Sequence, residues 1–246
     1  MSQPLSRRRV LAALLIALAA CLASASSAGA QAVATATPNL PGGEGTRVSW
    51  AVDGLVPPVA GRIPAALVMT APGFRLDRRA VARRCSQEQA TLDECPAKSR
   101  IGTALMTIRV HRPAGDINEV PIEITLYHGA KNVMLAVAFL VGTRVVPGTL
   151  QQTDAGVVLT FDPLPEPPAI LGVSYDFKSV SANLGASRKV TKRVGRPGHR
   201  RRRTVRYSLV RTPQSCDGGA WATSVLFSFP DTTSALLPAP MACGGS

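Results

Sequence analysis

Three histidines are the side chains of this sequence that could serve as the base of a serine hydrolase. His111 falls on the polar face of a predicted strand, His128 starts a predicted tight turn, and His199 lies in a basic segment. A serine hydrolase needs such a histidine held against a nucleophile. The sequence has no G-x-S-x-G motif, since Ser174 stands in GVSYD, which lacks the second glycine. Because metalloprotease, P-loop and dinucleotide-binding motifs are also missing from the sequence, we predict no catalytic residues, no metal and no cofactor. An extracellular hydrolase using His111 or His128 is the alternative.

The five cysteines are Cys21, Cys85, Cys95, Cys216 and Cys243. The last four are available for disulfides whether or not Cys21 belongs to the mature protein. In an exported chain four cysteines indicate two disulfides, for which three connectivities are possible. We favour the pairs of sequence neighbours, Cys85 with Cys95 and Cys216 with Cys243. A zinc site needs closer pairs than gaps of nine and 26 residues.

Most of the net charge of +13 lies in one segment. It contains ten basic residues and no acidic one: Arg188, Lys189, Lys192, Arg193, Arg196, Arg200, Arg201, Arg202, Arg203 and Arg206. Apart from these and three arginines near the N-terminus, the chain has 15 basic and 15 acidic residues. Valines on both sides of GRPGH predict a long hairpin with a mobile tip, so we expect a basic hairpin or disordered loop over 187–204.

The N-terminal 30 residues are typical of an export signal. Arg7, Arg8 and Arg9 precede an apolar run over 10–23, which is 14 residues and so shorter than the roughly 20 that a spanning helix needs. The small residues SAGA at 27–30 predict cleavage after Ala30. The string LAAC (18–21) gives the alternative of a lipoprotein acylated on Cys21, and SRRRVL (6–11) resembles a twin-arginine signal. Both alternatives still predict export.

Alternation of apolar and polar residues with a period of two dominates the chain from residue 44 onward. The predicted inner faces include Val48 to Val52, Ala104 to Val110, Ile122 to Leu126, Val157 to Phe161, Val173 to Phe177, Val205 to Leu209 and Trp221 to Phe229, taking every second residue. Such strands, separated by short turns, predict an all-β antiparallel sandwich of immunoglobulin-like or Greek-key type as a single domain over 44–246. The apolar run 133–141 indicates a strand buried on both faces. Residues 31–43 are expected to form a flexible lead-in.

A short helix is predicted where the strand pattern is interrupted. Ser86 and Gln89 have the spacing of a capping box, and the helix is expected to run to about Asp93, before Pro96. The favoured disulfide between Cys85 and Cys95 would pin this helical loop over one end of the sheet.

Two short motifs carry a resemblance to known proteins. CPAKSRIGTA (95–104) and TPQSCDGGAW (212–221) resemble motifs of exported, disulfide-containing β-rich proteins of high-GC Gram-positive, actinobacterial-type bacteria. The preference for arginine, 23 of 28 basic residues, fits such a source. The resemblance covers about residues 44–243 and implies a secreted β domain with disulfides and no known activity. The chain has DTTS at 231–234 where related chains tend to carry Asp-Gly.

Together these patterns predict an exported, non-catalytic module of the cell envelope or extracellular space. Its basic hairpin is expected to adhere to anionic envelope polymers or lipid head groups, because each cation near an anionic surface contributes about 1 kcal/mol at low salt. We expect no nucleic-acid partner, since export removes access to nucleic acid and no aromatic residue is interleaved with the arginines to stack on bases. A purely structural domain, with the hairpin as a charged linker, is the other reading.

Overall fold

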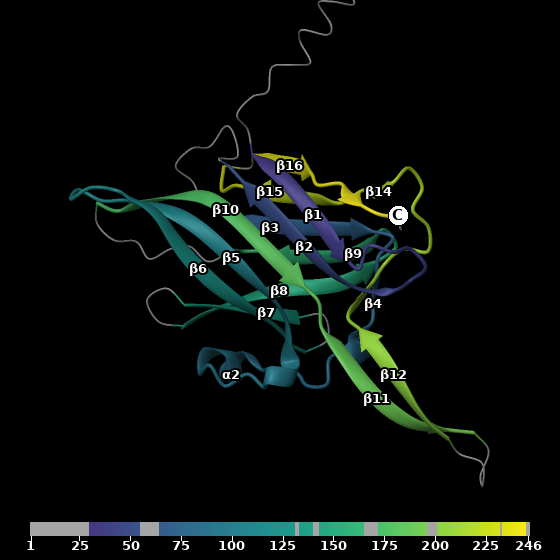
Figure 1. Cartoon of the computed structure of the whole chain (residues 1–246). Helices are drawn as coiled ribbons and strands as arrows, with labels where there is room; N and C mark the ends of the chain where they lie inside the picture. The colour runs from purple at the N-terminus through teal and green to yellow at the C-terminus, as the bar shows by residue number, and fades with distance from the viewer. Residues whose placement is uncertain are drawn as a thin grey trace, which may run out of the picture.

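A computed structural model describes residues 30–54, 64–130, 133–139, 143–164, 172–195, 201–231 and 233–244 (Figure 1). The expected leader before Ala30, with Cys21, lies outside these residues. So do Arg196 and Arg200 at the expected hairpin tip.

The described residues form one 13-stranded antiparallel sheet and two small two-stranded sheets. The order in the large sheet is β16-β15-β3-β9-β8-β7-β6-β5-β10-β2-β13-β4, with β1 paired on β2. Its strands are β1 (Gln31–Thr37), β2 (Gly45–Asp53), β3 (Ala66–Pro72), β4 (Arg75–Leu76), β5 (Arg100–His111), β6 (Ile117–His128), β7 (Val133–Phe139), β8 (Thr143–Thr153), β9 (Gly156–Phe161), β10 (Ser174–Leu184), β13 (Val210–Arg211), β15 (Ser224–Ser228) and β16 (Ser234–Pro238). The small sheets pair β11 (Ser187–Val194) with β12 (Arg201–Ser208), and β14 (Ala220–Trp221) with β17 (Met241–Ala242). The predicted antiparallel all-β class is confirmed.

The large sheet curls over a common apolar core. Phe177 on β10 and Phe227 on β15 come from strands far apart in the sheet order, yet their ring centroids are 5.4 Å apart. At the ends of the sheet, β1 contacts β16 (Figure 1). The alternating residues predicted to face inward, such as Trp50 and Leu159, are buried. The alternation of apolar residues with a period of two therefore corresponds to the burial of one face of each strand.

The prediction of a flexible lead-in over 31–43 is wrong for its first half. Residues 31–37 form β1, which pairs with β2 in the register Gln31↔Asp53 to Thr37↔Arg47. Ala34 and Ala36 are buried, whereas Val33 is exposed. Small alanines fill the inner face here, so the segment lacks the large apolar residues on which the alternation signal depends.

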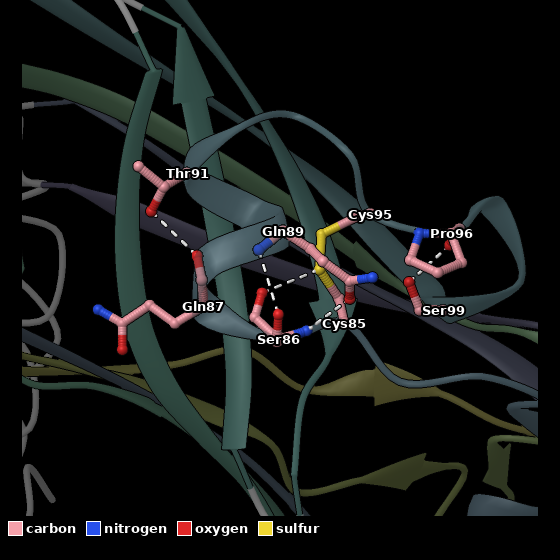
Figure 2. Close-up of a disulfide and its surroundings, with 8 residues drawn as sticks. All are labelled: Cys85, Ser86, Gln87, Gln89, Thr91, Cys95, Pro96 and Ser99. Atoms are coloured by element: carbon pink, nitrogen blue, oxygen red, sulfur yellow. Dashed lines mark hydrogen bonds between the residues drawn. A yellow bond between two sulfur atoms is a disulfide. The ribbon is translucent and has the colours of Figure 1, made fainter.

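The predicted helical loop and its disulfide are confirmed (Figure 2). Helix α2 (Gln87–Thr91) begins with both hydrogen bonds of a capping box, in which the Gln89 amide N–H donates to Ser86 Oγ and the Ser86 amide N–H to Gln89 Oε1. A disulfide joins Cys85 to Cys95. The helix covers the outer side of β7, where residues 134–138 are all buried. The predicted strand buried on both faces is therefore confirmed for these residues.

The second disulfide joins Cys216 to Cys243, beside the β14–β17 pair. Both connectivities are those favoured from the sequence. Two short 3₁₀ turns, η1 (Arg78–Ala80) and η2 (Ala97–Ser99), lie on either side of the α2 loop in the chain.

Candidate functional site

The basic segment forms a two-stranded ribbon that projects from the rest of the protein. We call β11 with β12 the basic ribbon and the remaining described residues the body. The ribbon strands pair only with each other, from Ser187↔Ser208 to Val194↔Arg201, and Figure 1 shows them extending away from the body. Eight of the ten predicted contact residues lie on the ribbon and all are exposed: Arg188, Lys189, Lys192, Arg193, Arg201, Arg202, Arg203 and Arg206.

The register of the ribbon places like charges opposite one another. Lys192 lies opposite Arg203, and Lys189 lies opposite Arg206. Arg193 likewise faces Arg202 across the strands. Directly opposed like charges destabilise a pair of strands. The ribbon therefore has unfavourable electrostatics that an external anion would relieve.

Within the described part of the chain, no ion pair joins a ribbon cation to a carboxylate. The ribbon cations make few side-chain hydrogen bonds, and these are to other residues of the ribbon. Lys192 Nζ donates to Tyr207 Oη at 2.7 Å, and Arg206 Nη2 donates to Ser187 Oγ at 3.4 Å. The charges of the ribbon are therefore not neutralised by the fold.

The root of the ribbon is held against η1 of the body. The guanidinium of Arg79 lies 4.7 Å from the centre of the Tyr207 ring, a cation–π contact. The same guanidinium forms a fork on Asp77, with Nε and Nη2 each 2.8 Å from a carboxylate oxygen. This hydrogen bond lowers the pKa of Asp77 below its ordinary value. The backbone adds to the attachment just after β12, because the Asp77 N–H donates to the Leu209 carbonyl at 2.8 Å.

Sequence reasoning missed the cations that the body contributes at this root. Arg47, Lys98 and Arg100 line a hollow together with Arg188 and Lys189 of the ribbon. They are far apart in the sequence, and no local pattern links them. Only the packing of β2, η2 and β5 beside the start of β11 brings them together.

His111, the first candidate base of a hydrolase, lies between two carboxylates. Its Nε2 is 2.8 Å from Asp176 Oδ2, and its Nδ1 is 3.0 Å from Asp116 Oδ2. The hydrogen bond to Asp176 is the largest cause that raises the pKa of His111, followed by the bond to Asp116. Ser174 is the cross-strand partner of His111. With both ring nitrogens facing carboxylates, however, the imidazole favours its protonated form and has no lone pair to accept a proton from that serine.

His128, the second candidate base, is buried at the end of β6, with 5% of its surface exposed. Neither ring nitrogen has a hydrogen-bond partner of normal geometry among the described residues. Burial lowers the pKa of His128 and favours the neutral ring. Among the described residues, His111 therefore has carboxylates at both ring nitrogens and none left for Ser174, and His128 has no hydrogen-bonded carboxylate.

The described residues contain no cluster of three or more His, Cys, Asp or Glu side chains placed to hold a metal ion. They also include no helix long and apolar enough to cross a membrane. The two disulfides indicate maturation in an oxidising, extracytoplasmic compartment.

No family model matches the chain, and no curated protein matches it. The resemblance drawn from CPAKSRIGTA and TPQSCDGGAW stays a prediction.

Proposed function

We propose that this protein is an exported, non-catalytic module that attaches to anionic polymers of the cell envelope through its basic ribbon. The observation that carries the proposal is the like-charge pairing across β11 and β12, exemplified by Lys192 opposite Arg203. A ribbon kept only as a spacer gains nothing from such pairs. A ribbon that lies along a chain of anionic groups is stabilised at every such pair, because each anion offsets the repulsion between two cations.

The ribbon side chains favour a polymer over a lipid surface. A segment that binds a bilayer through its interface inserts a broad apolar face. On the ribbon Val190, Val205 and Tyr207 are only partly exposed, and Val194 is exposed by 48%. The remaining exposed residues are cations, threonines and a serine. Electrostatic contact along a polyanion requires no apolar insertion.

Export is part of the proposal. The leader pattern before Ala30 supports secretion, with anchoring at an acylated Cys21 as the alternative, and both routes end outside the cytoplasm. The fold suits this setting, because two disulfides stabilise the body. We further propose that the curled sheet acts as the two layers of a β-sandwich, with the contact between Phe177 and Phe227 lying between the layers.

Co-sedimentation with isolated cell envelope across a salt series tests the proposal. The ribbon variant carries Lys192→Gln, Arg193→Gln, Arg202→Gln and Arg203→Gln. The matched control removes the same charge from exposed arginines of the body: Arg75→Gln, Arg83→Gln, Arg84→Gln and Arg144→Gln. We expect the parent and the control to sediment with the envelope and the ribbon variant to stay in solution. We also expect the affinity of the parent to fall steeply with salt, as counterion release dictates.

Equal binding of the two variants would overturn the proposal and leave the ribbon as a solvated structural element. Binding that salt does not weaken would also contradict it, because that result would place the contact on the neutral body.

A further inference from the structure

A hollow of about 970 Å³ lies where the basic ribbon leaves the body. Its walls come from four segments: β2, the stretch after η1, η2 with the start of β5, and the end of β10 with the start of β11. In Figure 1 this is the junction at which β10 continues into β11, beside the start of β5. We call this hollow the root pocket.

Among the described residues, five cations and no acid line the root pocket. Arg47 comes from β2, Lys98 and Arg100 from the η2–β5 stretch, and Arg188 and Lys189 from β11. Within the described part of the chain, none of these five side chains forms an ion pair or a side-chain hydrogen bond. Cations gathered around one space repel each other, and a bound anion would offset this repulsion by attracting each of them.

A second hollow, of about 850 Å³, adjoins the root pocket and shares Arg47 and residues 185–187 with it, yet its charges differ. It too contains arginines, but Glu44 and Asp77 lie among its lining residues. Its Arg79 is bonded to Asp77, and its Arg211 donates through Nε to the Gly43 carbonyl at 2.6 Å. Two acids therefore lie among the four arginines of this hollow, and Arg79 is paired with one of them, whereas no acid lies among the five cations of the root pocket in the described part of the chain.

The disulfide-pinned loop positions the wall that carries Lys98. Cys95 is bonded to Cys85, and the chain then turns sharply at η2. Ser99 closes the turn: its Oγ donates to the Pro96 carbonyl at 2.6 Å, and its backbone N–H donates to the same oxygen at 2.8 Å (Figure 2). Ser99 is fully buried, so Lys98 and Arg100 on either side of it are directed outward from a rigid turn.

The floor of the root pocket depends on close backbone packing. A Cβ on Gly102 would lie 2.1 Å from the Asn183 carbonyl oxygen, so only glycine lets β5 and β10 approach here. The Asn183 side chain lines the pocket and accepts a hydrogen bond from Ser49 through Oδ1, which leaves its Nδ2 group to donate to a ligand. The segment from Cys95 to Gly102, which the sequence singled out as a motif, therefore builds one wall and the floor.

We propose that the root pocket binds a phosphate group. This inference rests on the proposed function, since it takes the phosphate to belong to the anionic polymer that the ribbon holds. Arginine forks match phosphate oxygens in pairs, and lysines add point charge. A polymer phosphodiester carries one negative charge, as a carboxylate does, but its four oxygens surround phosphorus tetrahedrally, so five cations and an amide donor that converge from several walls can reach it together. The volume leaves room for the units that flank it in a polymer.

Titration of the purified, disulfide-bonded protein with inorganic phosphate, followed by amide NMR, tests the site. We expect saturable shifts at the amides of Gly102, Thr103 and Gly185, which line the pocket. The variant Lys98→Gln/Arg100→Gln should bind phosphate about tenfold more weakly or worse, because it loses charge-assisted hydrogen bonds. The matched variant Arg83→Gln/Arg144→Gln removes the same charge from outside the pocket and should change the affinity by less than about twofold.

Two competitors then test the chemistry and its source. Acetate should displace phosphate poorly, and displacement at equal concentration would overturn the preference for phosphate. Poly(glycerol phosphate) should compete at far lower concentration per phosphate than vesicles of phosphatidylglycerol and phosphatidylcholine. The reverse order would assign the phosphate to a lipid head group and overturn the polymer as its source.

The results separate this inference from the proposed function. If phosphate causes no localised shifts but the protein still sediments with the envelope, the phosphate site is overturned and attachment through the basic ribbon stands. Localised, saturable phosphate binding in a protein that ignores the envelope supports the pocket and overturns the attachment. Loss of both in the Lys98→Gln/Arg100→Gln variant, with the control intact, shows that pocket and ribbon hold one polymer.

Discussion

Strands β10 and β11 follow one another almost without a break, yet they belong to different kinds of sheet. Along β10 buried residues recur, including Phe177, Val180 and Leu184, and the strand pairs on both sides. After Gly185 and Ala186, β11 has no buried residue and one partner strand. The same backbone ladder is therefore supported by apolar packing in the body and opposed by charge repulsion in the basic ribbon. The difference separates what stabilises the fold from what is available for binding.

The largest effect should come from breaking the packing of the body. Phe227→Ala removes a fully buried ring that contacts Phe177, and we expect a loss of about 3–5 kcal/mol in the free energy of unfolding. Replacing 187–208 by a two-residue Asn-Gly turn between Ala186 and Leu209, which are already hydrogen-bonded, should cost less than about 1 kcal/mol. Denaturant unfolding of both variants measures the contrast. Comparable losses would show that the ribbon is part of the core.

Removal of a disulfide should have the next largest effect. The double variant Cys85→Ala/Cys95→Ala opens a loop of sequence separation 10, for which the chain-entropy relation gives about 3 kcal/mol. Cys216→Ala/Cys243→Ala opens a separation of 27 and should lose more, about 3.5 kcal/mol. Both losses belong to the body, so exchange of the ribbon amides with deuterium should change little. The reverse ranking in thermal unfolding would contradict the loop-length argument.

Reversing the charge of two cations on one ribbon strand should stabilise the ribbon and weaken its binding to the envelope. Lys192→Glu/Arg193→Glu places carboxylates opposite Arg203 and Arg202 and converts two repulsive cross-strand pairs into attractive ones. Each attractive pair contributes roughly 0.2–1 kcal/mol, so ribbon amides should exchange more slowly with deuterium while envelope binding falls. Slower exchange with undiminished binding would show that the positive charge of the ribbon is not what holds the polymer.

Features encoded by short stretches of sequence could be predicted. The faces around Trp50 and Leu159 follow from local alternation, the capping box from the spacing of Ser86 and Gln89, and both disulfides join sequence neighbours. Strand β1 was missed because its inner face is made of alanines, whose burial gives a weak signal.

Contacts between distant segments were beyond the reach of sequence reasoning. The root pocket joins cations from Arg47 to Lys189, which only the register of β2, β5 and β10 brings together. The same limit applies to His111, whose partner Asp176 lies 65 residues away and is placed by the β5–β10 register. The sequence predicts His111 to be a polar strand residue, but it does not show that carboxylates lie within hydrogen-bond distance of both ring nitrogens.

The smallest expected effects concern the pKa values of two histidines, His111 at the surface and His128 in the interior. Carboxylates raise the pKa of His111 above its ordinary 6.5, and burial lowers that of His128 below the same value. Protonated His111 therefore stabilises the fold fully below pH 6.5, and this contribution is lost as pH rises through its folded pKa. His128 acts oppositely, because protons taken up by the unfolded chain below pH 6.5 destabilise the fold.

An NMR titration of the imidazole protons measures both values in one experiment. Asp176→Asn should lower the pKa of His111 more than Asp116→Asn does, since the bond to Asp176 is the larger cause of its shift. Neither substitution should move the pKa of His128, whose shift comes mainly from burial. A pKa of His111 at or below 6.5 in the parent would show that the two carboxylates do not hold the ring in solution. His111 would then be free to act as a base beside Ser174, and the hydrolase alternative would regain its first requirement.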